Sequence, residues 1–445
     1  MGLRSPLTDL RGPRREPGLT KDEGIETNVQ SVTVVGQGYV GLAASVAVAS
    51  AGYTVHAAES DPRRLAALRE GRSYIPDVSS AAIREAMARG RFHPVADARD
   101  APPADVYLIA TPTPVTEENL PDLSLLDTAL ESIAPTVRPG ALVVLESTVY
   151  PGALRQYVAP RLTELSGLRA GAEVHLAYSP ERVDPGRGRS LGGIAKLVSG
   201  LDERSGKLAR AFYETVFSSV VEVSSSEVAE FAKLFENTFR YVNIAFVNEL
   251  SKAAHAMNIP FREVVAAAST KGFGFMPFHH GPGAGGHCLP NNVHYLNHAL
   301  RQAGFPSSLL EAAEDINRSM PEYAVERLRE LLEGRNIPLN RSRILLLGLA
   351  FKAGVADVRN SPARDIGDLL ATAGAQVRVA DPWVPPEEVA APLVAVELTA
   401  QECAAADAVV LATDHEEADY QLVLDSARLI LDCRGRLRSR EVVQL

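Results

Sequence analysis

Residues 281–292 read GPGAGGHCLPNN and place Cys288 behind a run of glycines and ahead of a proline and two asparagines. A cysteine thiolate is a strong nucleophile that can bond covalently to a carbonyl carbon. The backbone amides of a glycine-rich turn and a nearby cation lower the pKa of a cysteine. The glycines also let the backbone lie close to a ligand. This segment therefore indicates covalent chemistry at a carbonyl carbon.

A metal site is the competing interpretation of the same segment. Its ligands would be His279, His280, His287 and Cys288. Their spacing fits no familiar metal site, so we expect no metal.

A second segment with chemical meaning begins at Val32, where residues 32–62 read VTVVGQGYVGLAASVAVASAGYTVHAAESDP. Gly36, Gly38 and Gly41 form GxGxxG directly after a predicted strand and at the start of a predicted helix. The first glycine allows a tight turn, the second lets the backbone approach a pyrophosphate, and the third lets the helix pack on the strand. A lone GxGxxG also fits a simple strand-to-helix turn. The strand, the helix and a following acid together favour a dinucleotide site.

That acid is Glu59, at the end of the second predicted strand and 18 residues after Gly41. A carboxylate at this place can bind both ribose hydroxyls, whereas a 2′-phosphate would lie against its negative charge. Glu59 therefore predicts NAD rather than NADP. The nearby Arg63 and Arg64 weaken this preference without reversing it.

The composition describes a globular chain with several cores. It has 445 residues, 46% of them hydrophobic, which suggests two to four domains. No stretch approaches a membrane span and no signal peptide begins the chain, so we expect a cytoplasmic protein that binds no membrane. The net charge of −10 argues against sequence-independent binding of nucleic acid. Cys288, Cys403 and Cys433 form no CxxC pair, so we expect reduced thiols.

The order of predicted elements indicates an α/β protein. Strand-like runs such as SVTVVG, DVYLIATP and ALVVLEST alternate with helical stretches from Ser31 onward, as in a doubly wound parallel sheet. A second strand–helix–strand series begins at RSRILLLGLAFK and predicts a second Rossmann-like domain. The first 28 residues are rich in proline, glycine and charge and predict a disordered tail rather than a transit peptide. The predicted domains are a tail (1–29), a dinucleotide-binding Rossmann domain (30–222), a central helical dimerisation domain with the cysteine loop (223–325) and a C-terminal domain that binds the substrate (326–445).

A long helix is predicted between the two α/β domains. Apolar residues recur at helical spacing from about Ser226 to Asn258, after a cap at Ser225 or Ser226. A helix of this length can bridge two domains or form a dimer interface. Lys233 and Asn237 are four residues apart and share one face, where they can address one ligand. Without other information, Lys233 would be an exposed lysine on an amphipathic helix.

The first turn of the second α/β domain replaces the glycine fingerprint with Phe351 and Lys352, so we expect no second dinucleotide there. Arg359 and Arg434 follow predicted strands, at the edge where open α/β sheets bind ligands. They predict a phosphate pocket, with solvated surface arginines as the alternative.

Taken in order, these motifs resemble one family, the nucleotide-sugar 6-dehydrogenases, which include UDP-glucose dehydrogenase and the UDP-N-acetylhexosamine dehydrogenases. The resemblance extends from Ser31 to nearly the C-terminus. It depends on GQGYVG, ATPTP, ESTVYPG, SPERVDPG, AKLFENTFRYVNIAFVNEL, GPGAGGHCLP, GLAFKAGVADVRNSP, DPWV and TDHEE. It implies two NAD-dependent oxidations of a sugar C6 alcohol to a carboxylate, with Cys288 as the nucleophile.

The resemblance also assigns roles to individual residues. Lys233 stabilises developing negative charge, Asn237 hydrogen-bonds the reacting centre, and Glu181 and Thr148 position water. Phe351, Lys352 and Arg434 bind the nucleotide sugar, as do Arg240 and Gly285, and Arg359 reaches toward the cofactor. The cofactor-binding residues implied are Gly36, Gly38, Tyr39, Val40, Gly41, Glu59, Arg64, Thr111, Pro112, Thr113, Ser147 and Arg359.

Smaller differences in sequence indicate which subclass of this family the chain resembles. SPERVDPG, FENTFRYVN with Arg240, and GGHC resemble the N-acetylhexosamine enzymes more than the glucose enzymes, whose stretches usually read SPEFL and GGSC. We therefore expect a UDP-N-acetylhexosamine substrate, with UDP- or dTDP-glucose as the alternative.

One residue departs from the family pattern. Asn292, preceded by Asn291, stands where the family has an aspartate four residues after the nucleophile. An amide is no base near neutral pH, so thioester hydrolysis is put in doubt more than the first oxidation. The alternative bases are Glu181, His287 and His294. The remaining alternative is a sugar-nucleotide binding protein that has lost turnover.

Overall fold

The computed structural model describes residues 29–182, 194–439 and 441–445. Its contacts divide these residues into two compact units. The first contains the chain up to Phe235 together with His294–Gln302, and the second contains Glu236–Val293 and Ala303–Leu445. The predicted N-terminal tail lies outside the described residues, except for residue 29. Among the helices that the structure describes, none combines the length and hydropathy needed to cross a membrane.

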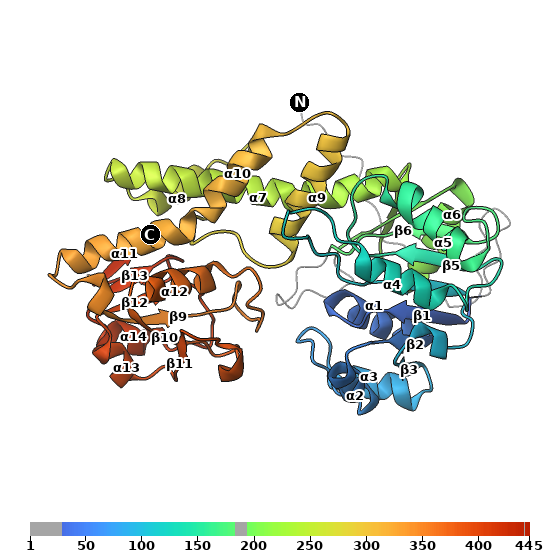
Figure 1. Cartoon of the computed structure of the whole chain (residues 1–445), viewed down its shortest axis with the longest axis horizontal. Helices are drawn as coiled ribbons and strands as arrows, with labels where there is room; N and C mark the ends of the chain where they lie inside the picture. Colours follow the sequence, from blue (N-terminus) through green and yellow to red (C-terminus); the bar gives the residue numbers. More distant parts are fainter. Residues whose placement is uncertain (1–28, 183–193, 440) are drawn as a thin grey trace. The chain divides into compact units, whose positions relative to one another are not determined.

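The first unit is built on a sheet in the order β3-β2-β1-β4-β5-β6-β7-β8. Figure 1 labels β1, β2, β3, β5 and β6 of this sheet. All neighbouring strands are parallel except β6 and β7, which are antiparallel. The strands are β1 (Ser31–Val35), β2 (Thr54–Ala58), β3 (Phe92–Val95), β4 (Val106–Ile109), β5 (Leu142–Leu145), β6 (His175–Tyr178), β7 (Lys196–Gly200) and β8 (Val220–Glu222).

Helices cover both faces of this sheet. Val144 of β5 packs in one core with residues of α1 and α6, and its neighbour Val143 packs in the other with residues of α4 and α5. This alternation follows from the period of two along a strand and explains why the central strands are apolar throughout. The helices are α1 (Tyr39–Ser50), α2 (Pro62–Arg69), α3 (Ser80–Ala88), α4 (Ser124–Ile133), the π-helix η2 (Leu154–Val158), α5 (Ala159–Ser166) and α6 (Glu203–Val216).

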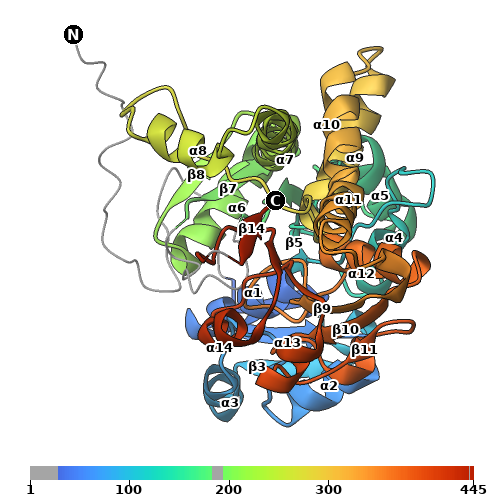
Figure 2. The same ribbon diagram turned by 90° about the vertical axis from the view of Figure 1, so that its left-hand side faces the viewer.

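The second unit contains a parallel sheet in the order β11-β10-β9-β12-β13-β14. Ile344 of β9 packs with α11 and α12, whereas Leu345 packs with α13 and α14, so helices cover both faces here too (Figure 2). The strands are β9 (Arg343–Leu347), β10 (Gln376–Ala380), β11 (Val394–Ala395), β12 (Ala408–Leu411), β13 (Ile430–Asp432) and β14 (Val442–Gln444). The helices are α8 (Phe261–Ser269), α10 (Ser308–Arg318), α11 (Met320–Glu333), α12 (Pro362–Thr372), α13 (Ala400–Ala405) and α14 (Tyr420–Ser426).

The predicted long helix is α7 (Ser226–Ala256), and α9 (Cys288–Gln302) follows the glycine-rich loop. Asn258 has a φ of 56°, a left-handed conformation in which the helix cannot continue, so α7 ends slightly before the predicted boundary. The predicted fold class, two Rossmann-like domains with a long central helix and further helices, is confirmed.

Candidate active site

The loop between β1 and α1 has the geometry of a dinucleotide cradle. Gly36 has a φ of 88°, and a Cβ there would lie 2.9 Å from the backbone oxygen of Ala110. A Cβ on Gly41 would lie 1.7 Å from the oxygen of Gly36, so only glycine lets α1 pack this closely. A Cβ on Gly38 would meet nothing within 4 Å, which leaves that side of the loop open to a ligand. α1 begins directly afterwards at Tyr39, and a helix N-terminus attracts phosphate.

Glu59 lies beside this loop and is only 6% exposed. Its carboxylate accepts hydrogen bonds from the backbone N–H of Gln37 at 3.2 Å and of Asp61 at 2.9 Å. Arg64 lies over the ring of Tyr74, 5.5 Å from its centroid, and the Tyr74 hydroxyl donates to the Gln37 carbonyl. The acid and Arg64 are thus held near the same turn, as the sequence interpretation requires.

The remaining predicted cofactor residues of the first unit follow the next two strands. Ser147, just beyond β5, donates its hydroxyl to the carbonyl of Thr111, just beyond β4, at 2.7 Å. Pro112 is exposed and Thr113 buried within the segment after β4. These residues therefore gather at the carboxyl edge of the sheet, where α/β sheets bind ligands.

The loop that carries Thr148 is tied to α7. Glu230 is fully buried and accepts the backbone N–H groups of Gly152 at 2.5 Å and Leu154 at 2.8 Å. Lys233 lies about one turn further along the same helix. The Glu230 bond therefore fixes the position of the Thr148 loop on α7, a role that the sequence did not reveal.

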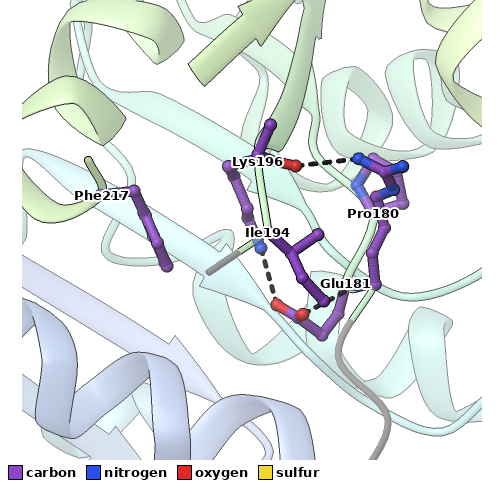
Figure 3. Close-up of a pocket in the computed structure, with 7 residues that line it drawn as sticks. Pro180, Glu181, Ile194, Lys196 and Phe217 are labelled. Carbon is purple, nitrogen blue, oxygen red and sulfur yellow. Dashed lines mark hydrogen bonds and ion pairs between the residues drawn. The ribbon is translucent and has the colours of Figure 1, made fainter. Parts of the chain in front are cut away.

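Glu181 is also held by charge. Its carboxylate contacts the Nζ of Lys196 at 3.0 Å (Figure 3). The same ammonium contacts Glu146 at 2.9 Å. Lys196 and Glu146 were missed in the sequence. The available signal was a lysine at the start of the apolar run KLVSG.

In the second unit the glycine-rich loop packs against the turn after β9. A Cβ on Gly285 would lie 3.1 Å from the Cβ of Phe351 and 2.6 Å from the oxygen of Asn360. Gly286 has a φ of 86°, and a Cβ there would lie 2.6 Å from the Phe351 ring. At the start of the loop, a Cβ on Gly281 would lie 3.2 Å from Nη1 of Arg434. The structure therefore brings Gly285, Phe351 and Arg434 together around one loop.

The reactive end of this loop is described only in part. Cys288 begins α9, and its side chain lies outside what the structure describes. Asn292 is 4% exposed, and its Nδ2 has no hydrogen-bond partner within the described chain. An unpaired buried donor is costly unless a ligand or water satisfies it, which suits a site residue.

Two residues to which the sequence interpretation gave no role fix the Phe351 turn, although they lie in the quoted motifs DPWV and TDHEE. Asp381, after β10, accepts the N–H groups of Leu349 at 2.6 Å and Ala350 at 3.0 Å. It also contacts Nε2 of His415 at 3.1 Å, and His415 accepts the N–H of Gly354 through Nδ1 at 3.3 Å. Although burial raises the pKa of Asp381, hydrogen bonds from His415 and the backbone outweigh it and hold this pKa well below its ordinary value. The carboxylate therefore stays ionised and anchors the turn.

The other predicted residues of the second unit are placed separately. Arg359 is half exposed and forms a two-bond ion pair with Asp357, at 2.9 and 2.6 Å. Arg240 is exposed on α7, Asn237 on the same helix is 9% exposed, and Lys352 is half-buried next to Phe351. Their roles remain predictions. Within the described residues, no group of three His, Cys, Asp or Glu side chains could hold a metal ion.

Comparison with known proteins decides what this arrangement represents. Three models of the UDP-glucose/GDP-mannose dehydrogenase family match the chain in order. They are the NAD binding domain at residues 30–217, the central domain at 227–319 and the UDP binding domain at 345–439. The chain belongs to the UDP-glucose/GDP-mannose dehydrogenase family. It is therefore an NAD-dependent nucleotide-sugar dehydrogenase, and the resemblance stated from the sequence is confirmed.

Members of this family resemble the chain along most of its length. A UDP-N-acetyl-D-glucosamine 6-dehydrogenase of Pseudomonas aeruginosa is 36% identical over 87% of this chain and 90% of its own. A UDP-N-acetyl-D-mannosamine dehydrogenase of Pyrococcus horikoshii is 34% identical over 92% and 97%. A solved structure of a UDP-D-ManNAc dehydrogenase from Pyrococcus horikoshii has a TM-score of 0.85 at 30% identity, and covers 93% of this chain and 99% of that one.

The residues of the first unit fit the NAD that this family uses. The open side of Gly38 admits a pyrophosphate, the start of α1 attracts its charge, and the buried Glu59 carboxylate stands ready for ribose hydroxyls. Bound there, NAD⁺ supplies a hydride acceptor.

Proposed function

We propose that the chain oxidises the C6 alcohol of a UDP-N-acetylhexosamine to the uronic acid in two oxidations, through a covalent intermediate on Cys288. The observation that carries the proposal is the packing of Gly285 and Gly286, just before Cys288, against Phe351 in the domain matched by the UDP binding model. This packing connects the predicted nucleophile loop to the predicted nucleotide-sugar loop within one unit.

The proposed reaction has four steps, in which every bond that forms or breaks is accounted for. The C6 alcohol loses a proton and a hydride to give the aldehyde, and the Cys288 thiolate adds to its carbonyl carbon to give a thiohemiacetal. Loss of a second proton and hydride gives a thioester. Water then attacks the carbonyl carbon, a C–O bond forms, the C–S bond breaks with its electron pair on Sγ, and the carboxylic acid leaves.

Each remaining residue is assigned one task in these steps. Lys233 stabilises negative charge on the C6 oxygen, and Asn237 donates a hydrogen bond to the reacting centre. Thr148 and Glu181 position water, and Glu181 accepts its proton. Asn292 is kept in the site as a donor rather than a base, because an amide binds no proton near neutral pH.

The N-acetylhexosamine is favoured over glucose by SPERVDPG, Arg240 and GGHC, and by the names of the two relatives described above. A panel experiment tests this choice. NADH formation and product mass are measured with UDP-N-acetylglucosamine, UDP-N-acetylmannosamine, UDP-N-acetylgalactosamine, UDP-glucose and dTDP-glucose. We expect two NADH per uronate and the highest kcat/KM with an N-acetylated sugar. A higher value with either glucose nucleotide would replace this substrate, and no NADH with any of them would refute dehydrogenation itself.

We also propose that the protein is a cytoplasmic homodimer assembled along α7. Phe231, Phe235, Phe239 and Phe246 of this helix are 41 to 60% exposed. Their spacing of four, four and seven residues places them along one stripe of the helix. Such a stripe is more apolar than a monomer's surface usually is.

A further inference from the structure

Lys196 is a buried cation at the start of β7. Its side chain is only 4% exposed, and its Nζ lies between the carboxylates of Glu146, which is 0% exposed, and Glu181, which is 14% exposed. The antiparallel pairing of β7 with β6 explains this arrangement, since Tyr178 pairs with Ser199. Continuing that register past the end of β6 brings residue 181 opposite residue 196. Figure 3 shows the two side chains pointing toward each other.

Two aromatic rings also lie close to the Lys196 ammonium. Its Nζ lies 5.3 Å from the ring centroid of Tyr213 and 5.5 Å from that of Phe217, within the range of cation–π attraction. The Tyr213 hydroxyl donates a 2.6 Å hydrogen bond to Oε1 of Glu146. Glu146 is therefore fixed in place, and with it the ammonium that it contacts.

Glu181 is held at both carboxylate oxygens. Oε1 accepts the backbone N–H of Arg182 at 2.7 Å, and Oε2 accepts from Lys196 at 3.0 Å. Burial lowers the pKa of Lys196, but the two carboxylates outweigh burial and raise this pKa above its ordinary value. Lys196 is therefore charged at any pH at which the protein is assayed.

A small hollow adjoins this pair. It is lined by Pro180, Glu181, Arg182, Ile194, Ala195, Lys196 and Phe217, and it leaves about 10 Å³ for the centre of a water molecule. That is about the space that one water needs, and the carboxylate and ammonium supply polar partners. A water can thus reach the Glu181 carboxylate without displacing the ion pair.

We propose that Lys196 is a positioning residue for the hydrolytic half of the reaction: it keeps Glu181 ionised and in one orientation, so that Glu181 accepts the proton of the attacking water. The inference rests on the proposed function, and in particular on the assignment of Glu181. In the step concerned, water loses one proton to Glu181, its oxygen bonds to the thioester carbon, and the C–S bond breaks to leave the Cys288 thiolate. No electron is transferred.

The alternative is a purely structural ion pair, and the two differ in which step a substitution affects. Without the ammonium, the negative charge of Glu146 is no longer balanced beside Glu181, and repulsion between the two carboxylates favours the protonated form of Glu181. Lys196→Met should therefore slow hydrolysis about 10- to 100-fold, up to the lower end of what full general-base help contributes, because Glu181 itself is still present. It should also raise the fraction of enzyme acylated on Cys288 during turnover, and move the acid limb of the kcat profile to higher pH. Lys196→Arg keeps the charge and should restore most of the rate.

A double-mutant cycle with Glu181→Gln makes the test decisive. The acyl-enzyme fraction is measured by acid quench and intact mass, beside kcat, for the wild type, both single variants and the double variant. If Lys196 acts through Glu181, adding Lys196→Met to the Glu181→Gln variant lowers kcat no further. Additive losses, or equal slowing of the alcohol oxidation with an unchanged acyl fraction, would overturn the inference.

Two further outcomes are separated by the same design. If Lys196→Met does not fold, Glu146→Gln serves instead. This change removes one negative charge and leaves Glu181 as the carboxylate of this pair that balances the charge of Lys196. The acid limb of the kcat profile should then move to lower pH, and an unchanged acid limb would overturn the inference. If the wild type forms neither uronate nor a Cys288 adduct, the proposed function fails, and the inference about Lys196 fails with it. Full activity of Glu181→Gln in a working enzyme refutes only the roles of Glu181 and Lys196.

Discussion

Glu230 and Gly152 are joined by a 2.5 Å hydrogen bond from the Gly152 backbone N–H to a carboxylate that is fully buried. Leu154, at the start of η2, donates to the other oxygen at 2.8 Å. Burial raises the pKa of Glu230 to about 7, although the two backbone N–H groups oppose the shift. The loop that follows Thr148 is therefore anchored by an acid that titrates near neutral pH.

The first prediction follows from this shift. A raised pKa in the folded protein means that the folded state binds more protons than the unfolded state between about 4.5 and about 7. The stability that Glu230 contributes is present below pH 4.5 and is lost as the pH rises through 7. At about 1.4 kcal/mol per pKa unit, the unfolding free energy falls by ~3 kcal/mol over this range. Glu230→Gln should flatten the fall in unfolding free energy between pH 5 and 8, measured by urea titration.

Glu227, on the same helix, provides the control. Arg155 and the start of α7 outweigh its burial and hold its pKa at about 2. The stability from this group is lost only below about pH 4.5. Glu227→Gln should therefore change the slope between pH 5 and 8 much less than Glu230→Gln does, because the Glu227 charge is only a lesser cause of the raised pKa of Glu230. An unchanged slope in Glu230→Gln would show that Glu230 is ionised throughout this range.

The second prediction concerns cofactor choice. The buried Glu59 carboxylate beside Gln37 repels a 2′-phosphate, so kcat/KM should be at least about tenfold higher with NAD⁺ than with NADP⁺. Glu59→Gln removes the negative charge of the side chain and keeps its shape. It should therefore bring the kcat/KM values for NAD⁺ and NADP⁺ closer together. Glu85→Gln is the control because it removes a carboxylate that is 62% exposed on α3 and paired with Arg89, and it should leave the ratio unchanged. Comparable kcat/KM values for both cofactors in the wild type would contradict this role of Glu59.

Local patterns made the glycine loop and the ends of α7 predictable. The three glycines and Glu59 lie within 24 residues of one another, from Gly36 to Glu59, and the strand before them ends at Val35. The end of α7 is likewise set by a local left-handed residue, Asn258. In both places the conformation depends mainly on neighbours in the chain.

Contacts that depend on pairing between distant segments could not be predicted. Glu146 meets Lys196 only because β7 runs antiparallel to β6, whereas alternating strands and helices suggested parallel neighbours. Asp381 reaches the Phe351 turn because β10 lies next to β9 in the sheet. Nothing in the local sequence of either acid shows which backbone or cation it will meet.

The third prediction concerns assembly. Because the phenylalanine stripe of α7 is exposed, a second copy of the chain should cover it, and sedimentation at micromolar concentration should give the mass of two chains. Replacing Phe235 and Phe246 together by Asp should give a single-chain mass. Leu120→Asp, at a residue that is 48% exposed in the loop between β4 and α4, should remain dimeric. A wild-type mass of one chain would refute the homodimer.

The fourth prediction separates the two oxidations. Cys288→Ser should abolish uronate because an alkoxy ester is a far poorer route through the second hydride transfer, while the alcohol-to-aldehyde step need not vanish. Product mass and the number of NADH formed per sugar show whether only the second oxidation is lost or both are. Cys403→Ala is the control, since burial raises the pKa of that thiol to about 11 and keeps it protonated. Continued uronate formation by Cys288→Ser would remove Cys288 from the nucleophile role.

The last prediction concerns Asn292, whose buried Nδ2 lacks a hydrogen-bond partner in the described chain. Asn292→Asp restores the base that the family usually carries. If thioester hydrolysis limits the natural enzyme, this change should raise kcat and shorten the life of the adduct trapped on Cys288 by acid quench. Asn291→Asp, at the equally buried neighbour, controls for a new charge beside the nucleophile and should not raise kcat. Should Asn292→Asp instead lower kcat at constant adduct level, Asn292 acts as a donor, and water activation belongs to Glu181 or to a histidine such as His287 or His294.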